Sequence, residues 1–397
     1  MDRFHDFAAK LRGPRAHASI ARYLEWQRTV RSSLAQGKEA PIFPENLGPL
    51  SVNLDLTTAC NFACDHCIDW DSLNSPVRYD MDSLRASLRA LTNRGMQSII
   101  LIGGGEPTLH PEFVSMVQFI KEELSLQVAV VSNGSRNEVI AEAASYLEAG
   151  DWVRLSLDSG TNETFQAMHH PKSGISLEEC CESACLIRSA NPDVTLGFSF
   201  VITWKGAQRE DASLIENVGE MASAAELAGN HGFDYISFKP YLSRTAEGAE
   251  VLVAKEVCGE DRIRAGIEAS RRATAHLKNF RVIESLNLQV LLDGSWPALT
   301  RQPKICHMQA LRQVISPLGI FNCPAHRGVS RARIGESGDW SGKAGSQGTA
   351  QVLENFDASQ ECSEVTCLYN SVNHLLEAAI DAGEDWTELP DCEDCFL

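Results

Sequence analysis

The chain lacks any run of the roughly 18 apolar residues that a membrane-spanning helix needs. Residues 1–30 also lack the apolar segment of a signal peptide. Positive charge is scarce, because 35 lysines and arginines face 53 acidic residues, for a formal net charge of −18. Such a charge disfavours nucleic acids and anionic membranes as partners, since both would be repelled. We therefore expect a cytoplasmic protein without nucleic-acid or membrane partners.

The acidic balance has two interpretations for function. An acidic surface would attract a cationic substrate, such as an amine-bearing small molecule, but net charge also simply keeps a protein soluble. The composition is otherwise that of a globular protein, with 44% hydrophobic and 22% charged residues. A chain of 397 residues has room for two or three domains, or for one large barrel with additions.

Short apolar runs alternate with longer amphipathic stretches up to about residue 241. Strands are expected at 50–56, 98–103, 127–132, 152–158, 194–202 and 234–241. Helices are expected at 81–94, 111–124, 136–149, 176–190 and 208–231. This alternation predicts βαβ units and a parallel sheet. Six such units would form an open, partial barrel, in which functional residues gather at the C-terminal ends of the strands.

Cysteine is abundant and clustered. Of thirteen cysteines, six follow residue 300, and Cys60, Cys64 and Cys67 lie together on the loop after the first expected strand. Disulfides are rare in reducing compartments, so clustered cysteines indicate metal or iron–sulfur ligation. Zinc and iron–sulfur sites usually take four protein ligands. A triplet is one ligand short of either kind of site, and an iron–sulfur cluster held by it would have one iron open to an external ligand.

The Cys-x3-Cys-x2-Cys triplet after a first barrel strand resembles the radical S-adenosylmethionine (radical SAM) superfamily. Three short motifs at later strand ends strengthen the resemblance: "GGGEP" (103–107), "SNG" (132–134) and "SLD" (156–158). The resemblance covers about residues 50–241. It implies an α/β fold, a partial (β/α)6 TIM-like barrel.

The resemblance also implies cofactors and their contacts. In the family, three cysteines hold a [4Fe–4S] cluster whose open iron is chelated by SAM, and an electron from flavodoxin or ferredoxin drives SAM cleavage to a 5′-deoxyadenosyl radical. Carried onto this sequence, the cluster ligands are Cys60, Cys64 and Cys67. The implied SAM-binding residues are His66 against the adenine, Gly103, Gly104, Gly105 and Glu106 at the amino group, Ser132 and Asn133 on the third turn, and Ser156 and Asp158 at the ribose.

The second cysteine set begins with "CHMQALRQVISPLGIFNC" (306–323), which reads as a β-hairpin. It resembles the opening of the SPASM and twitch extensions, which hold auxiliary [4Fe–4S] clusters. A full SPASM domain has about seven cysteines, so the six present here favour one auxiliary cluster, although two clusters sharing six cysteines stay open. Cys306 and Cys323 belong to either assignment of its ligands.

The remaining pair of ligands has two assignments. Cys392 and Cys395 have the Cys-x2-Cys spacing that often closes a twitch domain. Cys362 and Cys367 lie nearer to Cys323, and a ligand close to a chain end needs anchoring against fraying. We prefer Cys362 and Cys367.

The resemblance and the changes in composition divide the chain into four segments. These are an N-terminal helical extension (1–49), the barrel (50–245), a connecting helix and strand (246–300), and a small C-terminal auxiliary-cluster domain of twitch or SPASM type (301–397). Cys258 opens the connecting helix, and some radical SAM epimerases use such a cysteine as hydrogen-atom donor. On the loop after the fourth strand, His169, His170 and Lys172 are either substrate contacts or solvated residues.

The function that the resemblance favours is oxidation of a hydroxyl-bearing carbon in a small polar substrate, such as an amino sugar or aminocyclitol of natural-product biosynthesis. One alternative is a redox-neutral epimerase, dehydratase or decarboxylase. Another is a SPASM-type peptide maturase, although about 50 residues before the first strand are fewer than the usual peptide-recognition domain. An iron–sulfur electron carrier would not explain "GGGEP" or "SLD".

Overall fold

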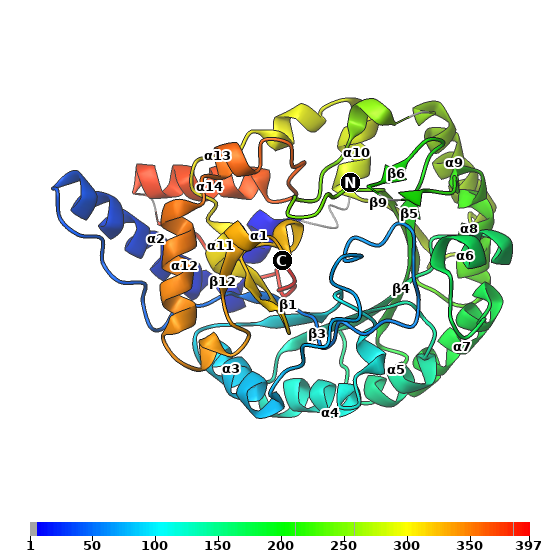
Figure 1. The fold of residues 1–397 in the computed structure, drawn as a ribbon, viewed down its shortest axis with the longest axis horizontal. Helices are drawn as coiled ribbons and strands as arrows, with labels where there is room; N and C mark the ends of the chain where they lie inside the picture. The colour runs from blue at the N-terminus through cyan, green and yellow to red at the C-terminus, as the bar shows by residue number, and fades with distance from the viewer. Residues whose placement is uncertain (1–5, 211, 258, 384) are drawn as a thin grey trace. The chain divides into compact units, whose positions relative to one another are not determined.

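The computed structural model describes residues 6–210, 212–257, 259–383 and 385–397 (Figure 1). Cys258, the candidate hydrogen donor, lies outside the described residues. The chain forms two compact units, each built from several stretches. The first unit comprises Met1–Leu54, Val77–Ile100 and Pro297–Leu397, and the second comprises Asp55–Pro76 and Leu101–Trp296. The four consecutive segments expected from the sequence stay a prediction.

The second unit carries parallel strands in the order β3-β4-β5-β8-β9. The strands are β3 (Gln127–Ser132), β4 (Trp152–Ser156), β5 (Thr195–Ile202), β8 (Tyr235–Pro240) and β9 (Arg281–Glu284). The helices are α4 (Phe113–Gln118), α5 (Asn137–Ala144), α6 (Asn162–His169), α7 (Leu177–Ala190), α8 (Met221–Asn230), α9 (Glu260–Ala273) and α10 (Leu286–Asp293). The expected α/β fold with mostly parallel strands is confirmed.

The strands of the second unit have one apolar and one polar face. Side chains alternate between the two faces of a strand, and residues in register share a face. Phe198 of β5 and Ile236 of β8 are in register and fully buried, so they share one face of these strands. On the opposite face, Ser156, Ser199 and Ser237 lie in register across β4, β5 and β8.

Gly197 of β5 lies beneath the ring of Tyr235. A Cβ atom at position 197 would lie 2.2 Å from Cζ of Tyr235, which is 3% exposed. We expect Gly197→Ala to displace this ring and to lower the free energy of unfolding by about 1–3 kcal/mol, as overpacked positions do. Urea unfolding measures the effect, and Gly219→Ala is the control because a Cβ there meets no atom within 4 Å. Equal stability of the two variants would contradict the prediction.

The first unit has strands in the order β12-β11-β10-β1-β2. The strands are β1 (Ser51–Leu54), β2 (Ser98–Leu101), β10 (Arg312–Ser316), β11 (Gly319–Phe321) and β12 (Arg333–Gly335). The helices are α1 (Phe7–Arg12), α2 (Pro14–Ala35), α3 (Met81–Asn93), α11 (Met308–Leu311), α12 (Ala344–Asn355), α13 (Ala358–Glu361) and α14 (Asn370–Ala382). Helices α1, α2 and α14 pack around a core that includes Tyr23, Leu24 and Leu376.

The hairpin expected after residue 306 is present as β10 and β11, which pair antiparallel. β10 also pairs in parallel with β1, with Ser51 opposite Arg312. The sequence did not indicate this second pairing, because it joins segments about 260 positions apart and depends on no local pattern. The C-terminal cysteine segment therefore shares a sheet with β1.

The single helix expected over 208–231 is wrong. The described part of this stretch forms a short hairpin of β6 (Gln208–Arg209) and β7 (Ala212–Ser213), and only α8 is an α-helix. The cause is Asn217, which is fully buried and whose Nδ2 donates to the carbonyl oxygens of Asp158 and Val201. These tertiary hydrogen bonds hold the segment out of a continuous helix.

No described helix is long and apolar enough to cross a membrane.

Candidate functional site

Cys60, Cys64 and Cys67 converge within the Asp55–Pro76 loop of the second unit. Burial raises the pKa of all three thiols, that of Cys67 to about 12. The neighbouring thiols of Cys67 and Cys60 raise the pKa of Cys64 further, because a thiolate at Cys64 would be repelled by a thiolate at either of them. Three half-buried cysteines on one loop are suited to hold a cationic metal group, because its charge would stabilise their thiolates.

The number of thiols bears on which metal group the cysteine loop could hold. Three thiols are one short of the four ligands that a structural zinc site takes. On a [4Fe–4S] cluster, which usually takes four cysteines, they would leave one iron without a protein ligand. Among the described residues, His66, Asp158 and His169 form a separate group whose ligand atoms all lie within 4.8 Å of one another.

The glycines of "GGGEP" pack against the cysteine loop. The backbone N–H of Glu106 donates to Ala59 O at 2.8 Å, and a Cβ on Gly105 would lie 2.3 Å from that same oxygen. Gly103 and Gly104 both have positive φ, at +64° and +65°, where glycine costs least. This stretch can approach the cysteine loop because it has no side chains.

Glu106 joins "GGGEP" to "SNG". Its Oε1 accepts hydrogen bonds from the Thr108 hydroxyl at 2.6 Å and the Ser132 hydroxyl at 2.9 Å, and its Oε2 accepts from the Asn133 N–H at 2.8 Å. Burial raises the pKa of Glu106, although these hydrogen bonds oppose the rise. A carboxylate oxygen has room for two donors. Oε2 can therefore still accept a hydrogen bond from a ligand ammonium.

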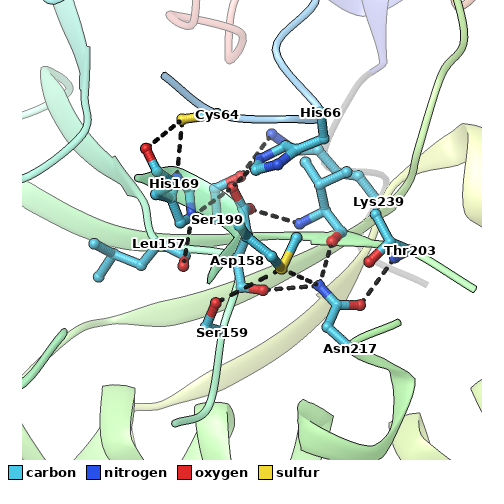
Figure 2. A network of polar contacts seen from close by, with 12 residues as sticks. Cys64, His66, Leu157, Asp158, Ser159, His169, Ser199, Thr203, Asn217 and Lys239 are labelled. Atoms are coloured by element: carbon cyan, nitrogen blue, oxygen red, sulfur yellow. Dashed lines mark hydrogen bonds and ion pairs between the residues drawn. The ribbon is translucent and has the colours of Figure 1, made fainter. Parts of the chain in front are cut away.

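Asp158 is the centre of a buried network at the end of β4 (Figure 2). Its Oδ1 accepts from the Val201 N–H at 2.7 Å, and its Oδ2 lies 3.1 Å from Nε2 of His66. Burial would raise the pKa of Asp158, but the hydrogen bonds and the nearby His66 and His169 hold it below its usual value. Both carboxylate oxygens are therefore engaged by protein groups. Ser156, the other predicted ribose contact, is in register with Ser199.

His169 links this network to the cysteine loop. Its Nε2 donates to Leu157 O at 3.0 Å, which leaves Nδ1, 3.1 Å from Cys64 Sγ, as an acceptor for the thiol. Burial lowers the pKa of His169 to about 4, and the charge of His66 contributes. The sequence analysis offered a substrate contact or a solvated residue here. The structure instead buries His169 between Cys64 and Asp158, at 2% exposure.

Lys172 and His170, the other two residues predicted after the fourth strand, make polar contacts with the cysteine loop. Lys172 donates from Nζ to Cys60 O at 3.1 Å, and His170 pairs with Asp65 at 3.0 Å. His66, predicted to lie against the adenine, packs edge-on against His169, with ring centroids 5.0 Å apart. The roles of the predicted SAM-binding residues stay predictions.

We expect Asp158→Asn to weaken SAM binding. Asparagine tolerates the left-handed backbone at this position, where φ is +52°, so the change removes charge and leaves the backbone in place. The loss of a charged hydrogen bond to His66 should raise the dissociation constant about 10- to 100-fold. Equilibrium dialysis with labelled SAM measures it, with exposed Asp193→Asn as control. Unchanged affinity would contradict the role of Asp158.

Sequence reasoning missed Lys239 on β8. Its Nζ donates to the Ser199 hydroxyl at 3.3 Å, and burial lowers its pKa well below the usual value (Figure 2). The sequence offered one signal, a lysine within the otherwise apolar strand "YISFKP". It also missed Arg154, a charged residue in the middle of β4.

The second cysteine set lies in the first unit. Burial raises the pKa of Cys362, and negative charges on Cys306, Cys323 and Cys367 raise it further. Burial, Cys306 and Cys323 have the same effect on the pKa of Cys367. Asn373 of α14 donates from Nδ2 to Cys306 Sγ at 3.3 Å. These four thiols therefore lie near one another beside α14.

Cys392 and Cys395 have other neighbours. Burial raises the pKa of Cys395 to about 11, and the charged residues that act on it include Arg15, Asp394 and Lys10. Its carbonyl oxygen accepts a hydrogen bond from the Ser98 hydroxyl at 2.8 Å. This arrangement supports Cys362 and Cys367 as the pair that completes a site with Cys306 and Cys323.

Comparisons with known proteins match the second-unit motifs. Residues 54–212 match the radical SAM superfamily. The chain is 27% identical over 174 residues to the S-adenosylmethionine-dependent nucleotide dehydratase of Selenomonas ruminantium, covering 41% of this chain and 60% of that protein. It is 32% identical over 122 residues to the mycofactocin maturase MftC of Mycobacterium tuberculosis, covering 30% of each. The chain thus spans 60% or less of the length of these relatives.

Solved structures share the fold. SuiB of Streptococcus suis bound to its precursor peptide SuiA superposes with a TM-score of 0.55 at 14% identity, covering 89% of this chain and 77% of that one. The structure of anSMEcpe with bound AdoMet has a TM-score of 0.55 at 14% identity, covering 84% of this chain and 98% of that one. At these identities the likeness concerns the fold. The cofactors of the matched superfamily are a [4Fe–4S] cluster and SAM.

Proposed function

The chain contains a radical SAM domain, and we propose from this premise that the protein is an enzyme that reductively cleaves SAM and removes a hydrogen atom from a small polar substrate. The observation that carries the proposal is the convergence of Cys60, Cys64 and Cys67 in the unit that also holds Glu106 and Asp158. When bound, the first cluster and SAM supply a 5′-deoxyadenosyl radical, and an auxiliary cluster supplies an electron acceptor.

The residues of the second unit bind and orient these cofactors. The cluster would be held by Cys60, Cys64 and Cys67, and Nδ1 of His169 contacts the sulfur of Cys64. Glu106 would accept a hydrogen bond from the SAM ammonium at Oε2, which has one protein donor. Asp158 holds His66 in place through its Nε2. Because these groups are already fixed by protein hydrogen bonds, the site needs little rearrangement when SAM binds.

The four thiols of Cys306, Cys323, Cys362 and Cys367 support net oxidation. These thiols would hold a second cluster, which would supply an acceptor for the electron that remains on the substrate after the hydrogen atom has left. In the proposed net reaction a hydroxyl-bearing carbon loses two electrons and two protons and becomes a ketone. One SAM is consumed for each ketone, giving 5′-deoxyadenosine and methionine. The proposal includes a cytoplasmic location and flavodoxin or ferredoxin as electron donor.

Anaerobic turnover of the reconstituted enzyme tests the proposal. With dithionite and SAM, we expect 5′-deoxyadenosine, and with an amino-sugar or aminocyclitol substrate we expect one ketone for each 5′-deoxyadenosine. No 5′-deoxyadenosine would refute a radical SAM activity. Deuterium uptake from D₂O at the reacting carbon without oxidation would replace the oxidation by epimerisation.

A second candidate is peptide modification. It is favoured by the superposition on SuiB bound to its precursor peptide, which covers 89% of this chain. A change in the intact mass of a supplied peptide that requires SAM and reductant would support it.

The 27% identity to a nucleotide dehydratase favours a redox-neutral reaction instead, which would release water without consuming an electron acceptor.

A further inference from the structure

Two cationic side chains share the polar face of the second unit. Arg154 of β4 is in register with Gly197 of β5, and Gly197 is in register with Tyr235 of β8. Lys239 lies four residues beyond Tyr235 on the same strand, so its side chain is on the same face. Arg154 and Lys239 therefore lie on the face that also carries Ser156, Ser199 and Ser237.

Within the described part of the chain, neither side chain of this pair forms an ion pair. The side chain of Arg154 makes no hydrogen bond or ion pair to a described residue, and its guanidinium lies 5.2 Å from the ring centroid of Trp152. The Nε atom of Arg154 is buried without a partner. In the same described part of the chain, Lys239 makes one hydrogen bond, to Ser199, and no ion pair.

The positive charge of Arg154 makes the charged form of Lys239 less favourable. Burial lowers the pKa of Lys239, and the positive charge of Arg154 lowers it further. The negative charge of Asp158 opposes this effect, but its carboxylate is engaged by His66 and the Val201 N–H. Arg154 and Lys239 are both half-buried, and keeping two such cations together costs free energy unless an anion joins them. In a chain with 53 acidic and 35 basic residues, this local excess of positive charge is opposite to the overall balance.

We propose that Arg154 and Lys239 bind an anionic group of the substrate, a carboxylate or a phosphate. The inference rests on the proposed function, because it assigns a substrate group to the same barrel. Arginine presents a planar fork of donors that matches carboxylate and phosphate oxygens, and lysine adds a compact positive charge. The hydroxyls of Ser156 and Ser199 on this face supply further donors. The substrate is thus expected to be an anion at its binding face, unlike the cationic substrate that the net charge of the chain alone would favour.

SAM also carries a carboxylate, which Arg154 and Lys239 could bind in place of an anionic group of the substrate. The experiment therefore measures phosphate binding and SAM binding separately. Inorganic phosphate is titrated by calorimetry into the reconstituted holoenzyme saturated with SAM, and SAM is titrated separately. We expect Arg154→Gln and Lys239→Met to bind phosphate at least about tenfold more weakly than the wild type, since each loses a charged hydrogen bond. Affinity for SAM should change less than twofold. Exposed Lys205→Met is the matched control and should bind both ligands as the wild type does.

Conservative variants guard against misfolding. Lys239→Arg keeps the charge and should retain phosphate binding within about tenfold of the wild type, and iron content reports whether each variant is assembled. No phosphate binding by the wild type, or equal binding by both neutral variants, would overturn the proposal. An equal loss of SAM affinity would assign the pair to the SAM carboxylate and overturn the substrate assignment. Neither titration needs turnover, so a wild type that binds phosphate but forms no 5′-deoxyadenosine refutes the proposed function alone.

Discussion

The Cys64→Ala variant is expected to form no 5′-deoxyadenosine from SAM and dithionite above the background of enzyme without cluster. Cys64 is half-buried, and its sulfur lies 3.1 Å from Nδ1 of His169. A [4Fe–4S] cluster held by three cysteines has no spare protein ligand, so loss of one thiolate removes the site for both cluster and SAM. Anaerobic assay with chromatographic detection of 5′-deoxyadenosine measures the effect.

The matched control is Cys185→Ala. Cys185 is an exposed cysteine on α7, so its removal should leave iron content and SAM cleavage as in the wild type. Full SAM cleavage by Cys64→Ala would refute the assignment of the triplet. A loss in Cys185→Ala equal to that in Cys64→Ala would show that the assay reports general damage.

The second large effect is expected for Cys362→Ala, which should lower iron from about eight to about four atoms per chain, since each [4Fe–4S] cluster carries four. Cys362 is grouped with Cys306, Cys323 and Cys367, and its thiol is buried among them. We expect SAM cleavage to continue while formation of oxidised product stops, because the site of the electron acceptor is lost. Iron and sulfide assays with product analysis measure both parts.

Cys395→Ala is the matched comparison, because Cys395 is also buried but has different neighbours. We expect it to keep about eight iron atoms per chain, the content of two four-iron clusters. The opposite pattern, with iron lost in Cys395→Ala and kept in Cys362→Ala, would assign the auxiliary ligands to Cys392 and Cys395. Iron loss in both variants would indicate two clusters sharing six cysteines.

The strands and the fold class could be predicted because their signals are local. An apolar run such as 195–202 forms β5 almost exactly where the pattern indicated, since its residues are buried on both sides. The stretch over 208–231 failed for the opposite reason. Its composition suits a helix, but buried Asn217 makes hydrogen bonds to Asp158 and Val201 that no local pattern reveals.

The candidate site also has parts that local sequence could predict and parts that depend on distant contacts. The triplet and the motif around Glu106 could be recognised from spacing alone, because each is contiguous in the chain. The contact of His169 with Cys64 joins residues 105 positions apart, and the contact of Lys239 with Ser199 joins residues 40 positions apart. Such contacts depend on strand register and helix placement.

The sequence by itself determined the α/β fold with mostly parallel strands and the presence of a cysteine triplet with the spacing typical of radical SAM domains, since both depend on short-range spacing and periodicity. Only the tertiary structure decided which distant groups meet. It brought Cys362 and Cys367 to Cys306 and Cys323, engaged Asp158 with His66, and placed Arg154 and Lys239 on one polar face. The physical reason is that burial and charge act through space, so residues far apart in the chain set one another's pKa and available partners.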